Sequence, residues 1–235
     1  MPTIEPREFL IAYLVFLCST TLHEFGHAKI GERLGSRLAT QAGLVTLNPI
    51  AHIRRSPFGM VIMPILGVLF FHWYWPIGWA SVPYDPTWGQ RNPRQQALMS
   101  LAGPAGNLVL VLAAFAACKI LLATGVLAIA DEATTLTHIL ESSDGNVNSP
   151  RAALAYGLPA MLFMNISLAI FNLLPIPPLD GSGALEGFFP SQTGPLFNKL
   201  RQVPALSMLL FFFAFNYAWH LTAPVQLWVA RLLIR

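Results

Sequence analysis

Long apolar stretches separated by short polar segments dominate the chain. The first is almost unbroken from Phe9 to Leu22, and it predicts a helix from about Arg7 to Gly31. A membrane-spanning helix needs about 20 apolar residues. Three further stretches come close to this length or exceed it, at Ala97–Thr124, Ala152–Leu174 and Ala205–Leu221. The pattern predicts an all-α membrane protein, a polytopic helical bundle.

The polar segments between these stretches are short. The segment Glu32–Ser56 is basic, and within it Gly43–Leu47 is apolar, β-branched in part and followed by Asn-Pro. These features predict a strand or hairpin near the membrane surface. Residues 76–96 form a proline-rich polar loop, residues 131–144 form an acidic loop, and Gln226–Arg235 is predicted as a short amphipathic tail.

Composition supports a membrane protein. Hydrophobic residues make up 54% of the 235 residues and charged residues only 11%, with a mean hydropathy of +0.55, whereas soluble domains carry about 25% charged residues. A soluble enzyme is therefore excluded. The net charge of +3 gives no reason to expect a nucleic-acid partner. We expect one integral domain over 1–235, with a core at 7–187 and a C-terminal span and tail at 188–235.

Candidate chemistry begins inside the first apolar stretch, at His23-Glu24-Phe25-Gly26-His27. On a helix, the two histidines at i and i+4 leave the same face, which suits two nitrogen ligands of one tetrahedral zinc ion. Glu24 lies on the adjacent flank, where it could take a proton from a metal-bound water. His23 follows Phe9 by about 21 Å of helix, so the motif is expected within a hydrocarbon core about 30 Å thick.

A hydrolytic zinc site needs a third protein ligand and one open position. Asp180 is the strongest candidate, because it directly follows a span in a segment interrupted by Pro175, Pro177 and Pro178. Such backbone is tolerated in a membrane only where it lines protein or a wet cavity. The alternative is an aspartate that caps the next helix. The other candidates are Asp85, Glu186, His52, His72, His138 and His220.

Three motifs occur in this order along the chain, at His23–His27, Leu101–Asn107 and Phe171–Gly181. Together they resemble the site-2 protease family of intramembrane zinc metalloproteases over roughly Leu14 to Gly187. The chain is similar to the small members that consist of the core alone, since its acidic loop has no room for a PDZ insertion.

The resemblance implies one Zn²⁺ per chain, bound by His23, His27 and Asp180, with Glu24 as the catalytic acid and base. It also implies a supporting role near the scissile peptide for Asn172. Asn107 is a second candidate for this role, but for Asn107 and Asn165 hydrogen bonding between spans is an equally good interpretation. The implied substrates are membrane-spanning proteins, and the implied reaction is hydrolysis of their peptide bonds.

The proposed ligand pair constrains the topology. Asp180 must reach the depth and side of His27, and both follow the C-terminal part of a span, so an even number of crossings must separate them. Two of the long stretches are convincing crossings. The additional stretch Phe58–Trp75 is therefore expected to re-enter rather than cross, folding back at Pro64 to Gly67. The expected fold has about four to five full spans plus one re-entrant segment.

Charge supports the same topology. With a re-entrant segment, the acidic loop faces one side, and the other side collects most basic residues, a positive-inside pattern. These are Lys29, Arg33, Arg37, Arg54, Arg55, Arg91, Arg94, Lys199 and Arg201. We expect a multi-pass protein of a bacterial or archaeal plasma membrane, with the candidate site towards the cytoplasm.

Two other functions are compatible with parts of the pattern. A catalytically idle scaffold or binding protein could keep this fold, but the intact His23, Glu24, His27 and Asp180 argue against it. A metal transporter built from broken spans is disfavoured because the sequence has no internal repeat. For the protease, Gly43–Leu47 could pair with an unwound substrate as an exposed edge, or it could be structural.

Overall fold

The computed structural model describes residues 5–71, 76–133 and 135–235. Four of its helices are long and apolar enough to cross a membrane: α1 (Pro6–Arg33), α6 (Pro93–Ala123), α7 (Pro150–Asn172) and α10 (Pro204–Ile234). A fifth span is possible only if one bent helix pair is counted. The expected polytopic all-α bundle is therefore confirmed.

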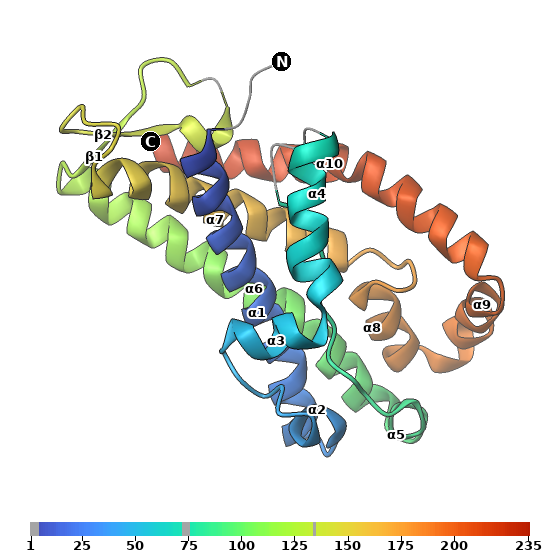
Figure 1. Ribbon diagram of the computed structural model, residues 1–235. Helices are drawn as coiled ribbons and strands as arrows, with labels where there is room; N and C mark the ends of the chain where they lie inside the picture. Colours follow the sequence, from blue (N-terminus) through green and yellow to red (C-terminus); the bar gives the residue numbers. More distant parts are fainter. Residues whose placement is uncertain (1–4, 72–75, 134) are drawn as a thin grey trace.

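Shorter elements connect these helices (Figure 1). Between α1 and α6 lie α2 (Leu38–Gln41), α3 (Pro49–Arg55), the π-helix η1 (Phe58–Ile62), α4 (Met63–Phe71) and α5 (Pro86–Arg91). Between α6 and α7 lie β1 (Leu127–Ile129), the 3-10 helix η2 (Leu136–His138) and β2 (Leu140–Ser142). Between α7 and α10 lie α8 (Asp180–Phe188) and α9 (Pro190–Gln202).

Two helix boundaries differ from the predicted ones, and proline at a helix start explains the first of them. Helix α6 begins at Pro93 rather than Ala97, because proline suits the first turn, where its missing N–H has no helical partner to lose. Helix α10 continues through Pro224 to Ile234, so the segment Gln226–Arg235, predicted as a short tail, is the end of this helix. Gln226 donates from α10 to the Phe163 carbonyl and holds this part of the helix against α7.

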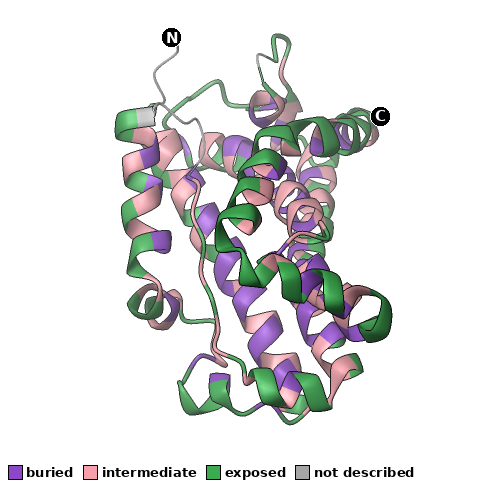
Figure 2. Ribbon diagram, turned by 90° about the vertical axis from the view of Figure 1, so that its right-hand side faces the viewer, coloured by how far each residue is buried: buried purple, intermediate pink, exposed green. Residues whose placement is uncertain are grey.

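Helix α6 is the centre of the bundle, with α1, α7 and α8 packed around it (Figure 1). Buried positions concentrate along these central helices, whereas the outer helices are mostly exposed or intermediate (Figure 2). Helices α1 and α6 approach very closely at Gly26, where a Cβ atom would lie 2.4 Å from the Ala102 carbonyl oxygen. This close approach brings α6 up to the histidine face of α1.

The small sheet lies elsewhere than predicted. Strands β1 and β2 pair antiparallel in the loop between α6 and α7. Residues 43–47 contain a turn at Gly43 and bends at 45–47 instead of a strand. Gly43 has φ +69°, a left-handed conformation that breaks the extended run, and the Leu44 amide donates back to the Ala39 carbonyl. The prediction of a strand or hairpin at this segment is therefore wrong.

The segment between α3 and α5 runs along the bundle in one direction and then returns. Helix α3 and the helix formed by η1 and α4 meet at 111°. The extended chain that follows runs back beside η1, where the Trp79 amide donates to the Gly59 carbonyl over 3.2 Å. It then returns to α5, at the end of the bundle that also holds α2 (Figure 1). The described parts run out and back, as expected of a re-entrant segment, and residues 72–75 between them lie outside the described residues. Helix α4 continues unbroken from Met63 to Phe71, because Pro64 lies in its first turn. The prediction that the chain folds back at Pro64 to Gly67 is therefore wrong.

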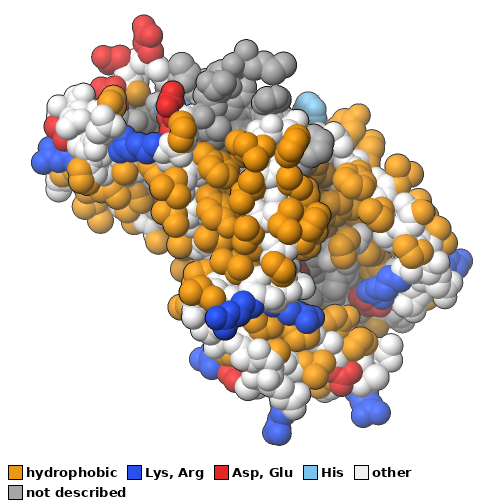
Figure 3. Space-filling view, viewed as in Figure 1, with side chains coloured by type: hydrophobic (Ala, Val, Ile, Leu, Met, Phe, Trp, Pro, Cys, Tyr) orange, Lys and Arg blue, Asp and Glu red, His pale blue; other side chains and the backbone are white. Residues whose placement is uncertain are grey.

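Charged side chains separate to the two ends of the molecule (Figure 3). A broad hydrophobic surface covers the middle. Many basic side chains lie at the end with α2 and α5, where a few acidic ones accompany them, and several acidic side chains lie at the end that carries the β1–β2 loop, where some basic ones lie as well. The molecule therefore has a belt suited to lipid and two chemically different ends.

Candidate metal centre

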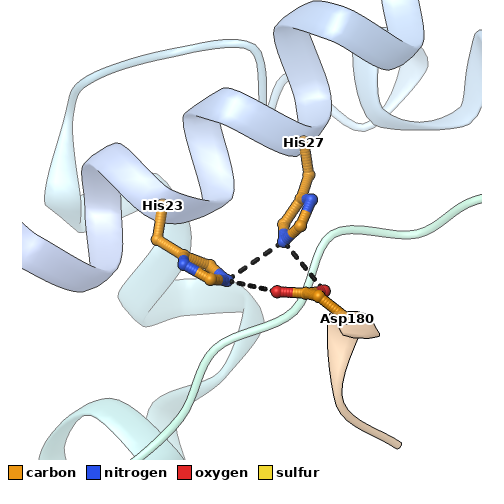
Figure 4. A group of neighbouring side chains, drawn as sticks. All are labelled: His23, His27 and Asp180. Carbon is orange, nitrogen blue, oxygen red and sulfur yellow. Dashed lines mark hydrogen bonds and ion pairs between the residues drawn. The ribbon is translucent and has the colours of Figure 1, made fainter. Parts of the chain in front are cut away.

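Helix α1 presents His23 and His27 on one face, one turn apart, in its second half. Both side chains are buried, with 8% of each residue exposed. Their Nε2 atoms lie 3.0 Å apart and point toward the start of α8 (Figure 4). The i, i+4 spacing in the sequence thus produces the convergent nitrogen pair that it predicts.

Asp180 completes the group from the opposite side. It is the first residue of α8, and the N-cap position before it belongs to Leu179, so the alternative of a helix-capping aspartate is wrong. The carboxylate instead faces both histidines, with 3.1 Å from Oδ2 to His23 Nε2 and 3.2 Å from Oδ1 to His27 Nε2 (Figure 4). Gly181 allows this placement, because a Cβ there would lie 2.1 Å from the Leu173 carbonyl oxygen.

These three side chains have the dimensions of a zinc site. Ligand atoms of a tetrahedral ion with bonds of about 2.0 Å are about 3.3 Å apart. The nearest ligand atoms of His23, His27 and Asp180 are 3.0, 3.1 and 3.2 Å apart in pairs. These three residues form the only such group of potential ligands found among the described residues. Two imidazoles and one carboxylate are ordinary zinc ligands and leave a fourth position open.

The outer nitrogens of both rings are occupied, which leaves the inner ones for a metal. His27 Nδ1 donates to the Met99 carbonyl over 2.8 Å, and His23 Nδ1 lies 2.7 Å from Asn107 Oδ1. Both partners belong to α6. Such outer contacts fix the tautomer and orientation of metal-ligating histidines. Gly103 of α6 fits between them, since a Cβ there would lie 2.3 Å from His27 Nε2.

Glu24 is buried beside the group, with 5% exposed. Its carboxylate lies within electrostatic range of the His27 ring. Its carboxylate makes no hydrogen bond to another described residue, and its oxygens are not among the fully enclosed polar atoms that lack a partner. It is therefore free of competing contacts and available for proton transfer.

Comparison with known proteins adds an independent result. The family model of Peptidase family M50 matches residues 11–215. The chain belongs to Peptidase family M50. This is the site-2 protease family, so the resemblance drawn from the motifs is confirmed.

Individual relatives agree with this assignment. YwhC of Bacillus subtilis (strain 168) is 30% identical over 184 residues, which are 77% of this chain and 71% of YwhC. Rip2 of Mycolicibacterium smegmatis is 31% identical over 188 residues (78% and 61%), and Rip2 of Mycobacterium tuberculosis (strain H37Rv) is 29% identical over 220 residues (90% and 71%). All three are named as zinc metalloproteases. No match was found among the solved structures.

The M50 peptidase is thus a membrane-embedded zinc metalloprotease, and the expected cofactor is confirmed. The histidine and aspartate geometry fits that cofactor. The shares of the relatives covered show that the match leaves more than a quarter of each relative's length outside it.

The two asparagines predicted to support the substrate lie in different places. Asn172 is the last residue of α7, and its amide nitrogen donates to the Leu168 carbonyl over 2.9 Å. It makes no hydrogen bond to the three clustered residues. Asn107 is fully buried and contacts both His23 and Asn165. In the M50 peptidase, Asn107 therefore lies behind a candidate ligand, in a network that joins helices.

The remaining third-ligand candidates are occupied elsewhere. Asp85 caps α5, and the hydrogen bonds that it accepts from the Thr87 hydroxyl and the Thr87 amide hold the pKa of this carboxyl below its usual range. Glu186 forms an ion pair with Arg201, and His138 lies within ion-pair distance of Glu8. His52 forms a hydrogen bond with the Thr46 carbonyl, and the His220 ring packs against the Tyr217 ring. His72 lies outside the described residues.

Sequence reasoning missed two contributors to the site. The Met99 carbonyl oxygen leaves no trace in a side-chain pattern. Gly103 does carry a signal, because a glycine beside proline in the early turns of a span indicates close helix contact. Its specific fit against both imidazoles appears only when α1 and α6 are packed together.

Proposed function

We propose that this M50 peptidase hydrolyses peptide bonds within or near the membrane-spanning segments of protein substrates, at a zinc ion held by His23, His27 and Asp180. One observation carries the proposal: ligand atoms of two buried histidines and the half-buried Asp180 converge at the separation that tetrahedral zinc requires, beside a helix long and apolar enough to cross a membrane. Zinc would supply Lewis acidity there, which polarises a carbonyl group and lowers the pKa of water towards about 7.

Glu24 is the proposed general base and acid. Glu24 is buried next to His23, and its carboxylate has no hydrogen-bond partner in the described chain. It would take the proton from the attacking water and later deliver that proton to the nitrogen of the leaving amine. Asn172, at the end of α7, is the proposed contact to the substrate backbone near the scissile bond.

The site favours a substrate that has lost its helical structure. A helix satisfies all its backbone hydrogen bonds internally and hides its peptide carbonyls within the helix. An irregular segment at residues 173–179 connects α7 to α8 and directly precedes the half-buried Asp180. An unwound stretch of a single-span protein, which needs new backbone partners, suits such a site.

We further propose that the site opens towards the cytoplasm, in a bacterial or archaeal plasma membrane. Nine of the 14 Lys and Arg residues belong to the segments expected on the side of α2 and α5, and the acidic loop at 131–144 lies at the opposite end of the bundle (Figure 1). The positive-inside rule places the basic end in the cytoplasm. The proposed functional unit is the single domain 1–235, with its core at 7–187.

Glu24→Gln tests the proposal. The purified full chain in detergent would be incubated with membranes rich in single-span proteins from the same host, and new protein termini would be identified by mass spectrometry. We expect cleavage to fall by about 10²- to 10⁴-fold, the usual contribution of a general base. Zinc should remain at one ion per chain, because the ligands are untouched.

The matched control is Glu32→Gln, since Glu32 pairs with Lys29 on the same helix, outside the site. Its cleavage should equal that of the wild type. Undiminished cleavage by Glu24→Gln would remove Glu24 from the mechanism. Wild-type zinc content after His23→Ala would contradict the ligand assignment.

A further inference from the structure

A row of buried polar groups extends from the His23 ring into the bundle. Asn107 Oδ1 lies 2.7 Å from His23 Nδ1, and Asn107 Nδ2 donates to Asn165 Oδ1 over 2.8 Å. Asn165 Nδ2 donates to Ser19 Oγ over 2.9 Å and to the Met161 carbonyl over 2.8 Å. Asn107, Asn165 and Ser19 each have no exposed surface. The row therefore joins α6, α7 and α1 without solvent.

The direction of these hydrogen bonds follows from one backbone group. The Met161 carbonyl can only accept, so the Asn165 amide must turn its nitrogen toward it and its oxygen toward Asn107. Asn107 must then meet that oxygen with its own nitrogen, which leaves Asn107 Oδ1 facing His23. An acceptor at this position requires that His23 Nδ1 carries the proton, and Nε2 keeps its lone pair.

Only one other contact favours this orientation of Asn107. Its Nδ2 also faces the backbone oxygen of Ser19, at 3.5 Å. This distance is long for a hydrogen bond between nitrogen and oxygen, so the contact is weak. The strong constraint on the Asn107 amide is Asn165.

We propose that Asn165, which does not touch the metal site, fixes the tautomer of the zinc ligand His23 through Asn107. This inference rests on the proposed function, because it takes His23 as a ligand. Without Asn165, the Asn107 amide can turn over and offer its NH₂ group to His23 Nδ1. That orientation favours the tautomer with the proton on Nε2, the atom that faces Asp180, and a protonated nitrogen cannot bind a metal.

Asn107 and Asn165 are thus positioning residues, and zinc affinity reports on them without any substrate. The affinity of the purified full chain in detergent would be measured by competition with a chromophoric zinc chelator. Asn165→Leu should weaken zinc binding by about 10- to 100-fold, the range seen when partners behind a metal-ligating histidine are removed. If this variant does not fold, Asn165→Ala removes the same amide.

A rescue experiment separates tautomer control from a merely structural role. The Asn165→Leu, Asn107→Asp double variant should recover most of the lost affinity, because a carboxylate presents an acceptor to His23 in either orientation. A gap or loosened packing left by Asn165→Leu would not be repaired by this change.

Gln226→Leu is the control, because it removes another buried amide between two helices, away from the site. Its zinc affinity should stay at the wild-type value. Wild-type affinity of Asn165→Leu, or a loss that Asn107→Asp does not restore, overturns the proposal. Wild-type affinity of His23→Ala would instead refute the ligand assignment, so the two failures are distinguishable.

Discussion

At the scale of single residues, the site depends on what is absent as much as on what is present. Gly103 lies where any side chain would enter the space between the two imidazoles. A Cβ atom at this position would lie 2.3 Å from His27 Nε2 and 2.7 Å from His23 Cε1. The missing side chain therefore keeps the inner nitrogens accessible.

Gly103→Ala should weaken zinc binding by at least about tenfold, because the methyl group must displace a ring from its ligating orientation. Chelator competition on the purified protein measures this. The matched control is Gly194→Ala in α9, where a Cβ meets nothing within 4 Å. Unchanged affinity in Gly103→Ala would show that α6 moves aside without disturbing the ligands.

The sequence pattern predicted that the three candidate ligands lie together, and for the two histidines the reason is geometric. His23 and His27 share a helix, so their spacing alone places them together. Asp180 was found because its chemistry suits zinc and prolines precede it. The outer shell was not foretold: Met99 contributes only a backbone oxygen, and the orientation of Asn107 depends on Asn165, which lies on another helix.

At the scale of elements, long apolar stretches predicted every span, because length and hydropathy depend on the membrane rather than on neighbouring elements. Short elements depended on context. Residues 43–47 have the composition of a strand, but Gly43 turns the chain at their start. Leu44 is buried, and its amide bonds back to the preceding turn. The composition of five residues does not include these contacts.

The helix formed by η1 and α4 has a specific anchor, the hydrogen bond of 2.9 Å from the Tyr13 hydroxyl to the Met60 carbonyl in η1. Tyr13→Phe should destabilise this segment locally by about 0.5–1.5 kcal/mol, the usual net contribution of a hydrogen bond. Hydrogen exchange of amides 58–62 would accelerate accordingly. Tyr217→Phe, at an exposed ring on α10, should leave exchange there unchanged, and equal exchange in both variants would rule out the anchor.

At the scale of the whole molecule, the arrangement in Figure 1 makes a prediction about sides of the membrane. The α5 region and the β1–β2 loop lie at opposite ends of the bundle. In a background with Cys18 and Cys118 replaced by serine, Gln90→Cys should react with a membrane-impermeant thiol reagent only from the cytoplasm. Glu141→Cys should react only from outside. Labelling of both positions from one side would contradict the topology.

The separation of the metal ligands along the chain has a consequence for biosynthesis. Asp180 is translated 153 residues after His27. At about 5–20 residues per second, the ribosome needs roughly 8–30 s to cover this distance. During that time α1 and α6 can already be in the membrane, but the third ligand does not yet exist. A nascent chain of this protease thus cannot attack neighbouring proteins at the insertion machinery before most of its own chain has been made.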